Sequence, residues 1–248
     1  MIKIINLLAI FLITANLSAS KQINYANLLS SNIDNTVIEF ELNDYDLIPI
    51  NTDNGIEYQI KIDGGSSFLK KGAPDINKFS KSIIIPDNAN MKIKILSSEY
   101  IEFENINVIP SKGNLLRSIN PNDIPYEYGK EYDENKFFPS SLAALQDPYI
   151  LRNLRGQTIN FHPIQYNPKK ELLRIYNKIT IEVYVDNYSS AKNILNRNQA
   201  YSKKSITKEF KNIYENHFLN FSSDNRFEYL NDRGNMLIIS YGSFIETV

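Results

Sequence analysis

Cysteine is absent from all 248 residues of this chain. A disulfide framework, a thiolate metal site and a cysteine nucleophile are therefore excluded within these residues. We expect any thiol catalysis connected with this protein to lie beyond Val248.

Histidine is also rare, and the net charge is close to zero. Only His162 and His217 occur, and they lack the spacing of zinc ligands, so we interpret both as structural and expect no metal site. The 27 basic and 28 acidic residues give a net charge of -1, which argues against nucleic acid or an anionic membrane surface as a partner. The pair Gly64-Gly65 lacks the lysine and helix of a phosphate loop, so no cofactor is expected.

No apolar run is long enough to cross a bilayer. The apolar stretch 7–13 falls well short of the roughly 20 residues that a spanning helix needs. Lys3 precedes it and small residues follow at 18–20, which is the order of a secretory signal. We expect signal peptidase to cut between Ser20 and Lys21, or one residue earlier, and the general export machinery to carry the chain out of the cytoplasm.

Alternating apolar and polar residues dominate the chain up to about residue 187 and predict β-strands with one buried face. Residues 179–185 give the clearest alternation, and 91–95 repeat it. Farther on, the apolar positions change phase, which predicts a β-bulge near Asn105. Further strands are expected at three segments separated by strong turn formers: 36–42, 56–62 and 81–85. This pattern predicts an all-β fold, a jelly-roll-like antiparallel β-sandwich.

The pattern changes after residue 187, where one amphipathic helix is expected. Ser205 is expected to cap this helix and Glu209 to lie in its first turn. Its apolar stripe consists of Ile206, Phe210, Ile213, Tyr214, His217 and Phe218. A polar stretch at 222–226 then leads to an apolar run at 236–239, which we expect to be a buried strand that opens a new domain.

A series of short motifs runs through the chain in a fixed order. They are Ile109-Pro110-Ser111-Lys112-Gly113, Ile124-Pro125-Tyr126, Tyr128-Gly129-Lys130, Asn135-Lys136-Phe137-Phe138-Pro139, Asp147-Pro148-Tyr149-Ile150-Leu151-Arg152, Arg155-Gly156-Gln157, Gln165-Tyr166-Asn167-Pro168, Leu173-Arg174-Ile175-Tyr176 and Lys192-Asn193-Ile194-Leu195-Asn196. In these motifs the chain resembles the pro-regions of gingipains, secreted cysteine peptidases of Bacteroidetes that hydrolyse peptide bonds after arginine or lysine.

The resemblance implies a β-sandwich pro-domain that binds its own protease domain, helps it fold and blocks its active site until cleavage. In the family, an arginine on the loop after the Pro-Ser-Lys-Gly motif enters the specificity pocket in a non-productive way, and Arg117 matches it. A guanidinium is permanently charged and forks toward a carboxylate, so Arg117 is the expected inhibitory plug. The alternative is an ordinary solvated loop arginine.

Activation in the family requires a cut between the two domains, and this cut usually comes after a basic residue in the polar linker before the catalytic domain. Arg226-Phe227 occupies that position, Arg233 is the second choice, and Lys203-Lys204 is a further candidate. Arginine at both the plug and the cleavage site favours a protease that prefers arginine to lysine.

We therefore expect three segments: a signal peptide at 1–20, a gingipain-type propeptide at 21–226, and the start of a truncated α/β catalytic domain at 227–248. The family's catalytic histidine and cysteine have no counterparts here, so the chain itself is expected to be inactive. Its main partner is expected to be its own downstream cysteine peptidase domain. The resemblance further implies extracellular export through the periplasm by type IX secretion.

A secreted β-sandwich adhesion or carbohydrate-binding module is the alternative function, because strand content and sixteen tyrosines would also fit it. A precursor with an inactive downstream domain is a third possibility. Codons beyond 248 that encode a histidine and a cysteine in an α/β domain would favour the precursor.

Overall fold

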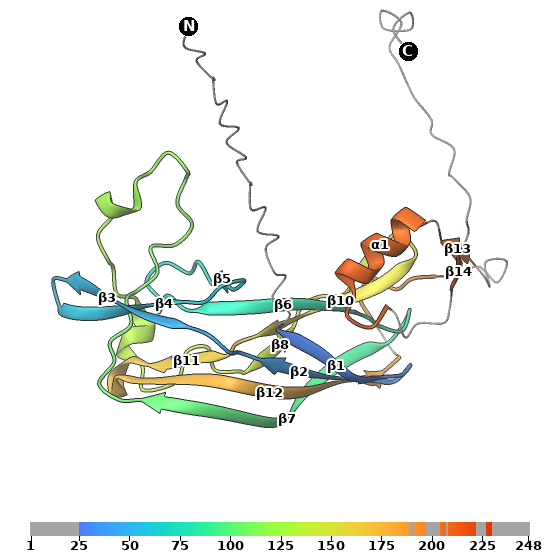
Figure 1. Cartoon of the computed structure of the whole chain (residues 1–248), viewed down its shortest axis with the longest axis horizontal. Coiled ribbons are helices and arrows are strands. Elements are labelled where there is room, and N and C mark those ends of the chain that lie inside the picture. The colour runs from blue at the N-terminus through green and yellow to red at the C-terminus, as the bar shows by residue number, and fades with distance from the viewer. Residues whose placement is uncertain (1–24, 189–190, 197–203, 207, 222–226, 230–248) are drawn as a thin grey trace, which may run out of the picture.

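The computed structural model describes residues 25–188, 191–196, 204–206, 208–221 and 227–229, and within them two antiparallel sheets pack face to face (Figure 1). The first sheet has the order β1 (Ala26–Ser31), β2 (Asn35–Glu41), β12 (Leu172–Asn187) and β11 (Ile164–Asn167), and β7 (Asn90–Phe103) also pairs with β12. The second has the order β5 (Ser66–Ser67), β6 (Asn77–Ile84), β10 (Leu154–Phe161) and β8 (Ala143–Leu145), and β9 (Tyr149–Leu151) also pairs with β10. The predicted antiparallel β-sandwich is confirmed.

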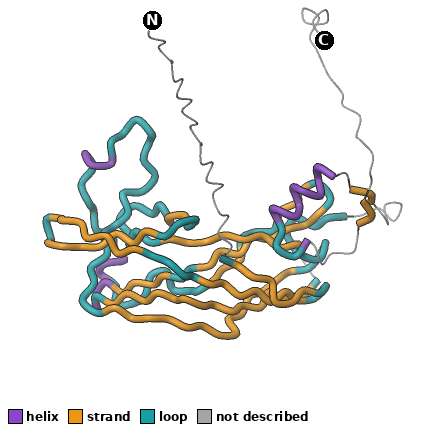
Figure 2. The backbone as a smooth tube through the Cα atoms, in the orientation of Figure 1, coloured by secondary structure: helices purple, strands orange, loops and turns teal. Residues whose placement is uncertain are grey.

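Smaller elements complete the described chain (Figure 2). They are the hairpin of β3 (Asp46–Thr52) and β4 (Gly55–Lys61), the parallel pair β13 (Lys204–Ile206) and β14 (Phe227–Tyr229), the 3-10 turns η1 (Pro121–Asp123), η2 (Lys130–Asp133) and η3 (Pro168–Lys170), and the helix α1 (Lys208–His217). No helix in this part of the chain has the length and apolar character needed to cross a membrane.

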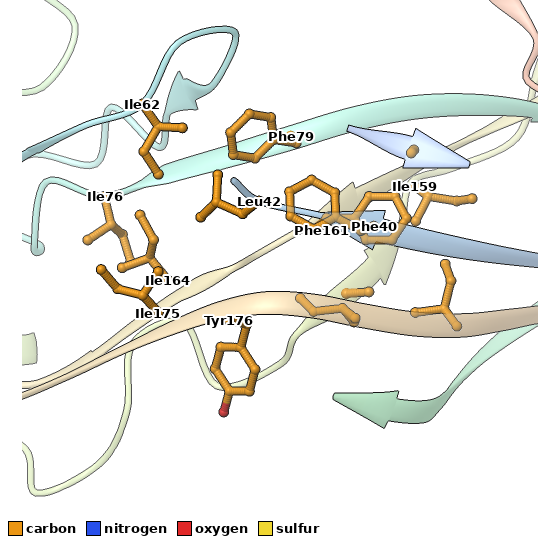
Figure 3. Close-up of a cluster of buried hydrophobic side chains, with 14 of the residues drawn as sticks. Phe40, Leu42, Ile62, Ile76, Phe79, Ile159, Phe161, Ile164, Ile175 and Tyr176 are labelled. Atoms are coloured by element: carbon orange, nitrogen blue, oxygen red, sulfur yellow. The ribbon is translucent and has the colours of Figure 1, made fainter. Parts of the chain in front are cut away.

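The core lies between the two sheets and contains closely packed aromatic rings (Figure 3). Phe40 of β2 lies with its ring centre 5.1 Å from that of Phe161 of β10 and 5.2 Å from that of Phe79 of β6. Ile179 and Ile181 of β12 are fully buried, as the alternation predicts. Burying each such side chain stabilises the fold by roughly 1.5–3 kcal/mol.

The predicted bulge near Asn105 is wrong. Strand β7 ends at Phe103, and Asn105 follows in the left-handed region with φ 58°. The next segment leaves the first sheet and bonds to β4 through Tyr58, whose N–H donates to the Asn107 carbonyl and whose carbonyl accepts from the Ile109 N–H. The change of phase in the sequence therefore marks a change of partner, while the extra residues of the β7–β12 ladder are Leu96, Asn177 and Asp186.

Helix α1 covers the outer face of the second sheet and begins later than the sequence pattern indicates. Ser205 lies in β13, paired with β14, so it is not the predicted cap. Glu209 does lie in the first turn. Tyr214 is buried as expected, but Ile213 is 49% exposed because it faces away from the sheet.

The chain after α1 is tied to the edge of β6. The Ile84 N–H donates to Asn220 Oδ1 at 2.7 Å, and Asn220 Nδ2 donates to the Ile84 carbonyl at 3.0 Å. Phe218 and Phe221 are buried beside this pair of hydrogen bonds. The Asn220 side chain thus satisfies two backbone groups that a neighbouring strand would otherwise satisfy.

Several sequence predictions fall outside the described residues. These are the signal segment with Ser20 and Lys21, and the basic residues Lys203, Arg226 and Arg233, together with the apolar run 236–239.

Candidate functional site: a projecting loop that carries Arg117

Residues 112–128 form a loop that rises from the sandwich beside the β3–β4 hairpin, at the end of the molecule away from α1 (Figure 1). We call it the projecting loop. Both of its ends are tied to the same short segment of chain. The Gly72 N–H donates to the Ser111 carbonyl at 2.9 Å, and the Gly129 N–H donates to the Gly72 carbonyl at 2.8 Å.

Gly72 is required at this junction for two reasons. Its φ of 82° lies in the region that side chains disfavour, and a Cβ on it would lie 3.0 Å from the Gly129 nitrogen. The two ends of the loop can therefore meet closely only around a glycine.

Side chains below the junction strengthen the base of the loop. The Tyr128 hydroxyl donates to the buried carboxylate of Glu57 on β4. Lys70 pairs with the buried Glu131 at 2.6 Å, and this hydrogen bond lowers the pKa of the Glu131 carboxyl. The Tyr132 hydroxyl donates to the Val108 carbonyl at 2.6 Å, and burial raises the pKa of Tyr132, so this donor stays protonated. The base is thus a rigid platform.

Arg117 is exposed and lies in the two successive turns of the loop, residues 116–123, which we call its tip. The Ile119 N–H donates to the Leu116 carbonyl at 3.0 Å and closes a four-residue turn with Arg117 at its second position. Among the described residues, none accepts a hydrogen bond from the Arg117 side chain or forms an ion pair with it. Leu116 beside it is 72% exposed. The tip therefore presents a free guanidinium with an apolar neighbour.

A lysine braces the two limbs of the loop. Lys112 Nζ donates to the Pro121 carbonyl at 2.8 Å and lies 4.1 Å from the centre of the Tyr126 ring. Both partners belong to the limb that returns from the tip. Lys112 thus joins the outgoing limb to the returning limb below Arg117.

The two histidines have different hydrogen-bond partners, and neither partner belongs to the projecting loop. His162 is buried, its Nδ1 lies 2.8 Å from the Ser141 carbonyl and therefore donates to it, and burial lowers its pKa. His217 Nε2 lies 2.6 Å from the Tyr149 hydroxyl, and partial burial lowers its pKa. Within the described ranges, no three His, Cys, Asp or Glu side chains gather in a metal-binding arrangement.

The sequence profile named Propeptide_C25 matches residues 18–224. The chain belongs to the Propeptide_C25 family. This membership confirms the gingipain-type propeptide predicted from the ordered motifs, and it favours that hypothesis over an adhesion or carbohydrate-binding module.

Individual relatives agree with the family. Gingipain R1 of Porphyromonas gingivalis is 38% identical over 186 residues, which cover 75% of this chain and 18% of the relative. Gingipain R2 of the same species is 34% identical over 196 residues, which cover 79% of this chain and 26% of the relative. The Propeptide_C25 chain thus spans about a quarter or less of the length of these relatives.

A solved complex of Porphyromonas gingivalis RgpB pro- and mature domains contains a chain that superposes on this one with a TM-score of 0.72. The two are 32% identical, and the match covers 81% of this chain and all of the other. A structure concerned with the zymogenic latency of gingipain K, 20% identical with a TM-score of 0.55, shares the fold.

Sequence reasoning missed the role of a second arginine in this Propeptide_C25 chain. Arg155 on β10 is fully buried and donates four hydrogen bonds of 2.7–2.9 Å to backbone carbonyls. The acceptors are Pro86, Ala89, Lys192 and Asn193. Arg155 thereby holds the chain after β12 against the turn after β6. The alternation along β10 could have indicated this burial, because Arg155 lies on the same strand face as Ile159 and Phe161 of the core.

Proposed function

We propose that this propeptide is the inhibitory and folding-assisting pro-region of a secreted, arginine-specific cysteine peptidase, and that Arg117 plugs the specificity pocket of that enzyme. The observation that carries the proposal is the free, exposed guanidinium of Arg117 on a loop whose base is fixed. A pocket that binds substrate arginine needs a carboxylate, and a guanidinium matches a carboxylate with two parallel hydrogen bonds.

The relatives support the choice of partner. The pro-domain of RgpB forms a complex with its mature domain, and this chain shares the fold of its 32% identical counterpart there. We extend that association to this chain and its own downstream peptidase domain. Secretion to the extracellular space, by way of an N-terminal signal and the type IX route, belongs to the same proposal.

Activation is proposed to occur by cleavage between Arg226 and Phe227, with Arg233 as the second choice. Phe227 is the first residue of β14, which pairs with Lys204–Ile206. A cut at this bond separates the propeptide at 21–226 from the segment that begins at 227.

Replacing Arg117 tests the proposal. Truncating one partner of a buried charge pair costs about 2–5 kcal/mol, so Arg117→Ala is expected to weaken inhibition by roughly 30-fold to several thousand-fold. Arg117→Lys keeps the charge but loses the fork, so its inhibition constant is expected to fall between those of the wild type and Arg117→Ala. The measurement is a titration of the full chain against a mature arginine-specific gingipain-type peptidase, with melting temperatures recorded in parallel.

Arg152→Ala is the matched control. Arg152 is also an exposed arginine in a turn-like position, with φ 56°, but it stacks on the Phe210 ring of α1 at 3.8 Å, away from the projecting loop. The Arg152→Ala variant should inhibit the peptidase as well as the wild type does. Unchanged inhibition by Arg117→Ala would refute the plug.

A further inference from the structure

The peptide bond that follows Arg117 lies inside a closed turn. The hydrogen bond from the Ile119 N–H to the Leu116 carbonyl, 3.0 Å long, brackets Arg117 and Ser118 as the two central residues. Extended peptides bind protein clefts by adding main-chain hydrogen bonds along their length, and a peptidase cleft uses its substrate backbone in this way. A backbone folded into a turn offers the Arg117 side chain without the extended backbone that cleavage requires.

The chain after this turn is folded just as tightly. The Asp123 N–H donates to the Asn120 carbonyl at 3.1 Å, and Asn120 Oδ1 accepts from the Asn122 N–H at 3.1 Å. Pro121 opens η1 and fixes its own φ. Two consecutive turns therefore occupy the whole tip from Leu116 to Asp123.

Lys112 joins these turns to the base of the loop. Its Nζ donates to the Pro121 carbonyl, which belongs to η1, and its charge rests on the face of Tyr126. Lys112 follows Ser111, whose N–H donates to the Ala73 carbonyl at 2.8 Å. The brace therefore runs from the base of the loop to η1, the turn that follows the 116–119 turn, and it restricts the separation of the two limbs that an extended tip would need.

We propose that Lys112 is a positioning residue that keeps the 116–119 turn closed, so that the peptidase binds Arg117 but cuts the Arg117–Ser118 bond only slowly. This inference rests on the proposed function of Arg117. Cleavage would consume one water molecule, leaving a carboxylate on Arg117 and a new amino group on Ser118. Correct placement of the reacting atoms dominates the rate of such a step, so a closed turn suppresses cutting without weakening the binding of the side chain.

The test separates binding from cutting. The full chain carrying Lys112→Met, which keeps the apolar stem but loses the donor and the charge, is mixed with a mature arginine-specific gingipain-type peptidase. Inhibition is followed over time, and mass spectrometry records the product that ends at Arg117. Initial inhibition is expected to stay within about threefold of the wild type, while cutting after Arg117 accelerates about tenfold or more, since one hydrogen bond and one cation–π contact are lost.

Three further variants sharpen the result. Lys112→Arg keeps the donor and the ring contact and should restore slow cutting. Lys71→Met removes the exposed pair with Glu127, 2.8 Å long, at the base of the loop, and should leave cutting slow. Ile119→Pro removes the donor that closes the turn and should be cut rapidly even with Lys112 in place.

Cutting of Lys112→Met no faster than the wild type would overturn the inference, and so would equal acceleration by Lys71→Met. Slow cutting of Ile119→Pro would show that the closed turn is not the protection. These outcomes are distinct from a failure of the plug itself, which would appear as full inhibition by Arg117→Ala.

Discussion

Two arginines of this chain show how the surroundings of a side chain decide its use. Arg155 is fully buried, and four backbone carbonyls accept its hydrogen bonds. Desolvation lowers the pKa of its guanidinium, yet arginine remains charged at neutral pH. Arg117 is exposed and has no partner within the described structure. Both lie in or near the ordered motifs of the sequence, but only Arg117 exposes its donors to another molecule.

Burial of His162 makes the stability of the propeptide depend on pH. Its folded pKa is lowered by desolvation, whereas the unfolded value is about 6.5. A group with a lowered folded pKa stabilises the fold above its unfolded pKa, and this contribution is lost as the pH falls through about 6.5 toward the folded value. The free energy of unfolding is expected to fall by at most about 1.4 kcal/mol per pH unit in that window through this residue.

His162→Asn isolates this effect, because asparagine keeps a donor for the Ser141 carbonyl but does not titrate. The measurement is urea unfolding of both proteins between pH 7.5 and 5. The difference in unfolding free energy between wild type and variant should shrink as the pH falls. A difference that is constant across this range would show that His162 does not couple to protons.

At the level of elements, the sequence predicts strands best where one face is buried. Residues 179–185 alternate because β12 lies in the middle of its sheet, with β2 and β7 on either side. Strand β7 has only β12 as a described partner, and several of its apolar side chains are exposed, including Leu96 at 48% and Ile101 at 50%. Weak burial leaves the pattern of this edge strand ambiguous. The bulge at Asn105 was misplaced because the segment after β7 leaves β12 and bonds to β4, so its apolar positions change phase without an extra residue in the ladder.

The candidate site was only partly predictable for a related reason. Local motifs indicate where Arg117 lies, but the features that present it join residues far apart in sequence. The base of the loop forms through hydrogen bonds of Gly72 to Ser111 and Gly129. In the same way, Ser205 is part of a strand and not a helix cap because β13 pairs with the distant β14. Such contacts form only when the chain has folded, so neither periodicity nor turn propensity reveals them.

The attachment of α1 to the sandwich is expected to depend on Asn220. Asn220→Ala would leave the N–H and carbonyl of Ile84 without these two side-chain bonds in a buried setting, at a cost of about 1–3 kcal/mol for each unsatisfied group. Chemical denaturation should show this loss. Asn216→Ala, which removes only an exposed bond to the Asn212 carbonyl, is the control and should change stability little. Equal stability of both variants would show that the two Asn220–Ile84 hydrogen bonds, which we call the anchor, do not stabilise the attachment of α1.

On the scale of the whole molecule, the loop to which we assign inhibition and the contacts that hold α1 lie in different places. The projecting loop and α1 lie at opposite ends of the sandwich, with the aromatic core between them (Figure 1). Substitutions at the tip of the loop should therefore change inhibition without changing the melting temperature, and substitutions under α1 should do the reverse. Sites more than about 7–10 Å apart usually contribute independently to stability.

The segment 21–226, made separately, is expected to fold alone into a mostly β monomer, because it contains both five-stranded sheets and the core between them. A shorter version that ends at residue 206 lacks α1 and the anchor, so Ile84 and Leu154 lose the cover of Tyr214, Phe218 and Phe221. Each lost aromatic contact removes roughly 1.5–3 kcal/mol, so the shorter version should melt at a clearly lower temperature. Circular dichroism and calorimetry on both measure this difference. A helix-dominated spectrum or the absence of a cooperative transition in 21–226 would refute an autonomous propeptide domain, and equal melting of the two versions would show that α1 contributes no stability to it.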